Sequence, residues 1–113
     1  MEKNIIVMTT ADSKELALRI ADKLLSKRAA ACVNIFNGVL SRYWWQGSIA
    51  SEEEVVLLIK TADYLFPQVS RLIKQLHSYQ CPEVISLPIT AGSQEYLKWL
   101  KDSLAQSGTT AED

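Results

Sequence analysis

The sequence ACVNIFNGVLSRYWWQGSIASEEEVVLLIKT, residues 31–61, determines the topology because it predicts two long strands joined by a turn. Its first part alternates in side-chain direction: Ala31, Val33 and Ile35 point one way, and Cys32, Asn34 and Phe36 the other. Asn37-Gly38 has the composition of a tight hairpin turn. The aromatic run at 43–45 extends the strand past that point, so we favour a bend or bulge there and place the turn at Gln46-Gly47.

A strand and a helix precede this hairpin. Residues 4–9 are largely apolar, which predicts a strand buried on both faces. Asp12 stands three residues before Glu15, the spacing of a capping box, so we expect a helix from there to about Lys27. The expected buried stripe of that helix consists of Leu16, Ala17, Ile20, Ala21, Leu24 and Leu25.

Two helices and one more strand follow the hairpin. Asp63 is the expected cap of a helix that carries Pro67 in its first turns and ends before Pro82. Residues 84–89 predict a strand, and Pro88 indicates that it lies at a sheet edge or that the strand ends there. A last helix is expected over residues 93–104. The expected buried side chains are Leu65, Phe66, Val69, Leu72, Ile73 and Leu76 in the earlier helix, and Tyr96, Leu97, Leu100 and Leu104 in the last.

The order of elements is therefore β-α-β-β-α-β with an added C-terminal helix. This order predicts an α+β fold, the ferredoxin-like split βαβ sandwich, with a long central β-hairpin and both long helices on one face of a four-stranded antiparallel sheet. We expect residues 1–106 to form a single domain and the polar residues 107–113 to form a flexible tail.

The other sheet face does not show the polar alternation of a face exposed to water. Residues 55–59 are all apolar, and Phe36 and Cys32 point away from the expected core. Tyr43, Trp44 and Trp45 extend the hairpin beyond the reach of two helices. Large apolar patches of this kind are typical of interfaces, and tyrosine and tryptophan are typical interface anchors. We therefore predict a homo-oligomer.

Composition and charge exclude several classes of partner. The 113 residues include 48% hydrophobic and 22% charged side chains, and 12 basic against 13 acidic residues give a net charge of −1. This balance gives no electrostatic reason to expect nucleic acid or an anionic membrane. No apolar run is long enough for a signal peptide or a membrane span, so we expect a cytoplasmic protein whose two cysteines remain thiols.

The segment HSYQCPEV, residues 77–84, contains the only histidine of the chain. His77, Cys81 and Glu83 are donor types that bind copper or zinc. The same residues also fit a structural role, in which His77 caps the preceding helix, Cys81 packs as a small apolar side chain and Glu83 makes a salt bridge or hydrogen bond. A catalytic cysteine would need an oriented third group beside the histidine, and the sequence offers none, so we do not expect an enzyme.

Five blocks of the sequence resemble the CutA divalent-cation tolerance proteins. They are AACVNI at 30–35, YWWQGSI at 43–49, VVLLIKT at 55–61, HSYQCPEVISLPI at 77–89 and YLKWL at 96–100. The resemblance implies a ferredoxin-like subunit in a homotrimer with the architecture of PII-type signalling proteins, in which long hairpins of three subunits pair edge to edge. It also implies divalent-cation tolerance through binding of copper or another divalent cation, with no accepted catalytic reaction and no organic cofactor.

The chain departs from the family pattern at several positions. Ser78 and Gln80 stand where the family usually has proline and glutamate, and Gln46 replaces a usual glutamate. Some members build a copper site from a cysteine at the end of the first strand and two adjacent histidines. The matching positions here are Thr9, Leu76 and His77, so only the histidine at 77 is present.

Two candidate sites follow from the residues and the resemblance. The metal candidates are His77, Cys81, Glu83 and Cys32, the last of which also fits simple packing. By analogy with PII-type trimers, Tyr43, Lys60, Tyr79 and Glu83 would line a ligand cleft between subunits, with Lys60 and Glu83 as an ion pair. Besides metal binding, a small-molecule sensor and a scaffold for a partner protein therefore remain alternative functions.

Overall fold

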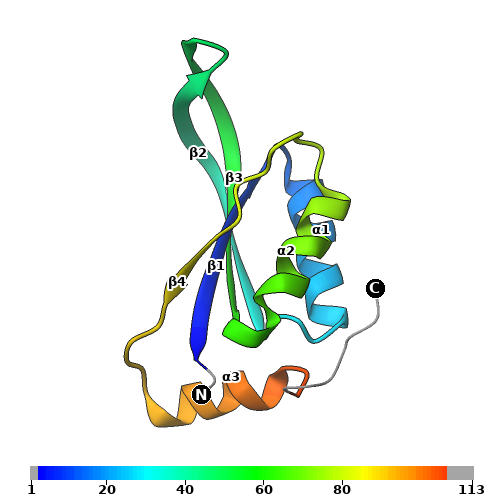
Figure 1. The fold of residues 1–113 in the computed structure, drawn as a ribbon, viewed down its shortest axis with the longest axis vertical. Helices are drawn as coiled ribbons and strands as arrows, with labels where there is room; N and C mark the ends of the chain where they lie inside the picture. The colour runs from blue at the N-terminus through cyan, green and yellow to red at the C-terminus, as the bar shows by residue number, and fades with distance from the viewer. Residues whose placement is uncertain (1–2, 107–113) are drawn as a thin grey trace.

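The computed structural model describes residues 3–106, which form one antiparallel sheet with three helices (Figure 1). The predictions for the tail at 107–113 lie outside the described residues. The strands are β1 (Asn4–Ala11), β2 (Cys32–Trp45), β3 (Ser48–Ala62) and β4 (Ile85–Pro88), and the helices are α1 (Lys14–Ser26), α2 (Phe66–Leu76), which a short 3-10 turn η1 (Asp63–Leu65) precedes, and α3 (Gln94–Ser103).

The sheet has the order β2-β3-β1-β4, and every neighbouring pair is antiparallel. Helices α1 and α2 lie side by side over one face, and α3 lies across the end of the sheet where β1 begins (Figure 1). This arrangement confirms the predicted ferredoxin-like fold. None of the helices within residues 3–106 is long and apolar enough to cross a membrane.

The central hairpin has the predicted turn and the predicted bulge. Strands β2 and β3 pair from Cys32↔Lys60 to Trp45↔Ser48, with one register shift between Phe36 and Val39. Gly38 lies inside that shift at φ +69°, a conformation that glycine adopts without strain. Gln46 and Gly47, at φ +49° and +85°, make the tight turn, since two positive φ values match the twist of a hairpin.

The main core lies between the sheet and the two long helices. Alternate β3 residues, among them Leu57 and Ile59, are fully buried against it, as period-two alternation requires. A smaller cluster lies under α3. The fully buried large residues of the main core are Val7, Ile20, Leu24, Leu57, Ile59, Val69, Leu72 and Ile73, and the smaller cluster consists of Ala62, Leu65, Leu100 and Leu104.

Both predicted aspartate caps are wrong. The cap of α1 is Ser13, whose Oγ accepts the N–H of Leu16 at 3.1 Å, while Asp12 accepts a hydrogen bond from Ser78 instead. Asp63 begins η1 and makes no side-chain cap; its carboxylate accepts the N–H of Lys3 at 3.1 Å. In both cases the carboxylate accepts a hydrogen bond from a residue far along the chain. Local sequence spacing cannot reveal such a partner.

Three predictions of burial are also wrong. Leu25, expected in the α1 stripe, is exposed because it lies at the solvent edge of that stripe. Tyr96 is exposed because it lies beside Lys60, away from the small cluster under α3. Strand β1 buries one face completely and leaves Ile6 and Met8 partly exposed on the other.

We predict that Ser13→Ala lowers the free energy of unfolding by about 1 kcal/mol, because the N–H of Leu16 loses its acceptor. Urea unfolding at a fixed protein concentration measures this loss. Ser51→Ala is the matched control, since Ser51 is an exposed strand residue, and it should change stability by less than about 0.5 kcal/mol. Equal effects of the two substitutions would contradict the assignment of Ser13 as the cap.

Candidate functional site

The sheet face opposite α1 and α2 is apolar and uncovered. The side chains of directly paired residues on neighbouring strands point to the same face of the sheet. The pairings Ile6↔Lys60, Met8↔Leu58 and Phe36↔Val56 therefore show which residues lie on the uncovered face. We call this surface the open face; it consists of Ile6, Met8, Cys32, Asn34, Phe36, Val56, Leu58, Lys60, Ile85 and Leu87. Leu87 is 45% exposed, and Phe36 and Ile85 are exposed to a similar degree.

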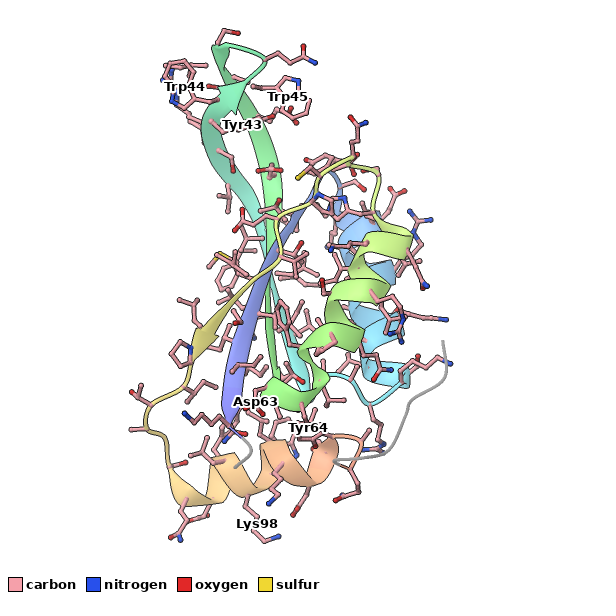
Figure 2. The ribbon with its side chains drawn as sticks, viewed as in Figure 1. Tyr43, Trp44, Trp45, Asp63, Tyr64 and Lys98 are labelled. Carbon is pink, nitrogen blue, oxygen red and sulfur yellow. The ribbon has the colours of Figure 1, made fainter. Side chains whose placement is uncertain are left out.

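The outer half of the hairpin carries further exposed apolar side chains beyond the helices. Trp44, at its tip, is 73% exposed, and Trp45 lies on the opposite side of the hairpin (Figure 2). Leu40 and Ile49 on the same half are also exposed. Within residues 3–106, the strands β2 and β4 are both sheet edges whose outer backbone groups have no strand beside them. Trp44 pairs with Ile49, and these two residues and Leu40 lie on the face opposite the open face. A single copy therefore leaves the open face, the exposed side chains of the hairpin tip and two pairing edges uncovered.

A polar segment closes one end of the open face. We call residues 77–84, which connect α2 to β4, the strap. The ring of His77 has both nitrogens engaged: Nε2 lies 2.5 Å from the carbonyl oxygen of Thr10, and Nδ1 accepts the N–H of Tyr79 at 3.0 Å. Because a carbonyl can only accept, Nε2 is the donor nitrogen of the ring and Nδ1 is the acceptor. A metal at His77 would have to displace one of these bonds.

Three carboxylates surround the strap and the adjoining part of the hairpin. The hydroxyl of Tyr79 donates to Glu54 at 2.7 Å, and Ser78 donates to Asp12 at 2.9 Å. The hydroxyl of Tyr43 donates to Glu52 at 2.5 Å. Glu54 is only 8% exposed, so its bond to Tyr79 satisfies a carboxylate that burial would otherwise destabilise. The bonds of Tyr79 and Ser78 fix the strap to β3 and to the residue that follows β1, and the bond of His77 to Thr10 fixes it to β1 itself.

The same contacts raise the pKa of both tyrosines. The hydrogen bond to Glu52 is the main cause that raises the pKa of Tyr43 to about 12. Burial is the main cause that raises the pKa of Tyr79 further above its ordinary value, followed by its hydrogen bond to Glu54 and by the negative charges of Glu54, Glu52 and Asp12. Both phenols therefore remain protonated donors at neutral pH.

The predicted metal residues do not converge in one copy. Cys81 and Glu83 are exposed on the strap, and the nitrogens of His77 are engaged. Cys32 pairs with Lys60, whereas the strap is attached at Thr10, which pairs with Val56; this offset is about 13 Å along the strands. Residues 3–106 contain no group of three histidine, cysteine, aspartate or glutamate side chains placed to hold a metal ion.

The predicted ligand residues separate into two places. Tyr43 and Tyr79 bond to Glu52 and Glu54, which are alternate residues of β3 and share a face. Lys60 lies about 20 Å farther along that strand, where it donates to the hydroxyl of Tyr96 at 3.3 Å. Sequence reasoning missed Glu54, Asp12 and Tyr96. The i, i+2 spacing of Glu52 and Glu54 is the one signal that places two of the carboxylates on one face.

We predict that Tyr79→Phe destabilises the protein by about 1 kcal/mol at neutral pH, because Glu54 loses its donor. A raised pKa means that this stabilisation is complete below pH 10, the ordinary pKa of tyrosine, and is lost as pH rises through the folded-state pKa. Urea unfolding of both proteins between pH 7 and 11 tests this. A stability difference that grows with rising pH would contradict it. Tyr64→Phe, at a tyrosine that donates to the backbone oxygen of Ala105, provides a comparison far from these carboxylates.

Comparison with known proteins identifies relatives along most of the chain. A family model for the CutA1 divalent ion tolerance protein matches residues 5–103. The divalent-cation tolerance protein CutA of Thermus thermophilus is 44% identical over 98 residues, which cover 87% of this chain and 95% of the relative. Protein CutA 1, chloroplastic, from Oryza sativa is 42% identical over 104 residues, which cover 92% of this chain and 59% of that longer relative.

Solved structures agree with these matches. The crystal structure of CutA1 from Oryza sativa matches at a TM-score of 0.90 and 42% identity, covering 93% of this chain and 96% of that one. The structure from Thermus thermophilus matches at a TM-score of 0.87 and 43% identity, covering 93% and 100%. Since sequence and backbone agree over nearly all the described residues, including the long hairpin and the strap, the chain belongs to the CutA1 divalent ion tolerance protein family.

Proposed function

We propose that the protein acts in divalent-cation tolerance as a homotrimer that binds copper or another divalent metal ion in response to metal. The observation that carries this proposal is the open face. Three copies of an apolar sheet face can cover one another around a common axis, and closed symmetry leaves none of them exposed. The free edges of β2 and β4 and the exposed hairpin tip supply further surfaces for pairing between copies.

The donors of a single described copy do not fit a metal ion. The engaged ring of His77 and the distance of Cys32 from the strap both argue against a site within one protomer. Cys81 and Glu83 are exposed and can meet donors of another copy. We therefore assign cation binding to the assembled protein, with Cys81 and Glu83 as its donors and His77 as the residue that holds the strap.

The proposed role is binding and not catalysis. The names of the relatives describe tolerance to divalent cations, and the phenols and carboxylates near the strap are already paired with each other. We propose a cytoplasmic location for this chain, although relatives include proteins named as chloroplastic and periplasmic. Fractionation of cells that express the protein tests the location.

We predict that Leu87→Asp converts the trimer into monomers, because it places a charge on the open face. Leu18→Asp is the matched control: Leu18 is 43% exposed against 45% for Leu87, but it lies on α1, outside the open face. Sedimentation equilibrium at micromolar concentration should show trimers for the wild type and the control, and 12.7 kDa monomers for Leu87→Asp. A monomeric wild type would refute the assembly.

We predict that Cys81→Ser and Glu83→Gln each weaken zinc or copper binding to the trimer at least tenfold, whereas His77→Ala lowers stability with little change in affinity. Calorimetric titration and metal analysis measure affinity and stoichiometry. Glu95→Gln, at an exposed glutamate of α3, is the control for Glu83→Gln. Full-affinity binding by the monomeric Leu87→Asp variant would contradict a site between copies, and a large loss of affinity in His77→Ala would make His77 a ligand.

A further inference from the structure

We propose that Lys60 and Tyr96 form a binding site for an oxyanion, a carboxylate or a phosphate, where the open face meets α3. The inference does not depend on metal binding. It rests on a set of hydrogen-bond donors without an acceptor and on a lysine without a counter-ion.

The geometry brings two elements together. Lys60 is on β3, between Cys32 of β2 and Ile6 of β1 in the pairing register, and is partly buried. Its Nζ lies 3.3 Å from the hydroxyl oxygen of Tyr96 and 5.4 Å from the centre of that ring. The ring of Trp99, one turn later in α3, lies 5.4 Å from the ring of Tyr96.

The polar groups at this point are donors. An ammonium group has three N–H bonds and no acceptor, and one of the three is directed to the hydroxyl of Tyr96. The oxygen of that hydroxyl is therefore the acceptor, and its O–H is left to donate outward. Within residues 3–106 we find no acceptor for this O–H or for the other two N–H bonds of Lys60. Two N–H groups and one O–H thus remain available to one oxyanion.

The charge of Lys60 is also uncompensated. Among the described residues it has no carboxylate within ion-pair distance, unlike Lys98, which pairs with Asp102 on the surface of α3. Its neighbours across the sheet, Cys32 and Ile6, carry no charge, and Leu87 continues the same row. Covering the open face would remove water from an unpaired ammonium, which is unfavourable unless an anion accompanies it.

Two sources can supply that anion. A carboxylate of a second copy and a free small anion offer the same oxygens to the same donors. The exposed rings of Tyr96 and Trp99 add an apolar wall that suits the organic part of a ligand. The chemistry of the site is the same in either case, and the experiment separates the sources.

The test is calorimetric titration of the full chain with citrate and with inorganic phosphate, in a buffer that contains neither anion. With a free ligand we expect saturable binding that weakens at least tenfold in Lys60→Met and about threefold in Tyr96→Phe. Lys60→Arg keeps the charge and should stay within threefold of the wild type. The control is Lys101→Met, which removes an exposed lysine of α3 and should leave binding unchanged.

Sedimentation of the same variants measures their assembly and so tests whether the anion is a carboxylate of a second copy. If the wild type binds neither probe but Lys60→Met shifts the assembly toward monomers, with recovery in Lys60→Arg, the anion is a carboxylate of another copy. Restored assembly in Lys60→Glu when it is combined with Glu83→Lys would identify that carboxylate. If neither probe binds and Lys60→Met assembles as the wild type does, the proposal is wrong.

Discussion

The dominant constraint on this molecule is the uneven covering of its sheet. Two helices cover one face, where Leu57 and Ile59 meet Ile20 and Leu72 without exposure to water. The other face carries side chains of the same apolar character but has no layer of its own chain above it. A half-covered sheet is stable in water only if its outer face is polar or is covered by something else. The apolar pattern that folds one copy therefore also creates the surface on which the proposed assembly depends.

Most polar groups near the open face form hydrogen bonds that attach the strap at its end. His77 uses both nitrogens to hold the strap, and the hydroxyl of Tyr79 donates a hydrogen bond to the buried carboxylate of Glu54. Such fully paired networks fix a geometry, because each member would be destabilised alone. Groups with unused donors or ligand atoms are more informative about ligands. Within residues 3–106 these include Cys81, Glu83 and Lys60, which uses one of its N–H bonds on Tyr96.

The topology could be predicted from the sequence because periodicity reports burial directly. The apolar run at 55–59 and the alternation at 31–36 are properties of the chain itself, and they placed the strands and the unusual outer face. The cap of α1 was predicted wrongly because aspartate and serine are both good cap residues, and Asp12 and Ser13 are adjacent. The carboxylate of Asp12 instead accepts a hydrogen bond from the hydroxyl of Ser78. Local spacing contains no information about such a distant partner.

The candidate sites were predictable only in part, for the same reason. Tyr43, Lys60 and Tyr79 were predicted by analogy to line one ligand cleft, but their partners, Glu52, Tyr96 and Glu54, follow only from pairing register and helix placement. The distance between Lys60 and the tyrosines at the strap follows from counting residues along β3 once the register is known. A single sequence shows which side chains can act, and the fold decides which of them act together.

The bulge at Gly38 also decides whether the even-numbered or the odd-numbered residues of β2 lie on a given side of the hairpin. Before the bulge, the even-numbered residues Asn34 and Phe36 lie on the open face. After it, the odd-numbered residues Val39, Ser41 and Tyr43 lie on that side, because the bulge adds one residue to β2. Loss of one residue here would leave every helix and both strands intact. Phe36 and Val39 would then stand two positions apart, as their partners Val56 and Glu54 do, so Tyr43 and Trp44 would each keep their side. What would be lost is the local bend and the added twist of a bulge, so this one extra residue sets the direction in which the outer arm leaves the sheet.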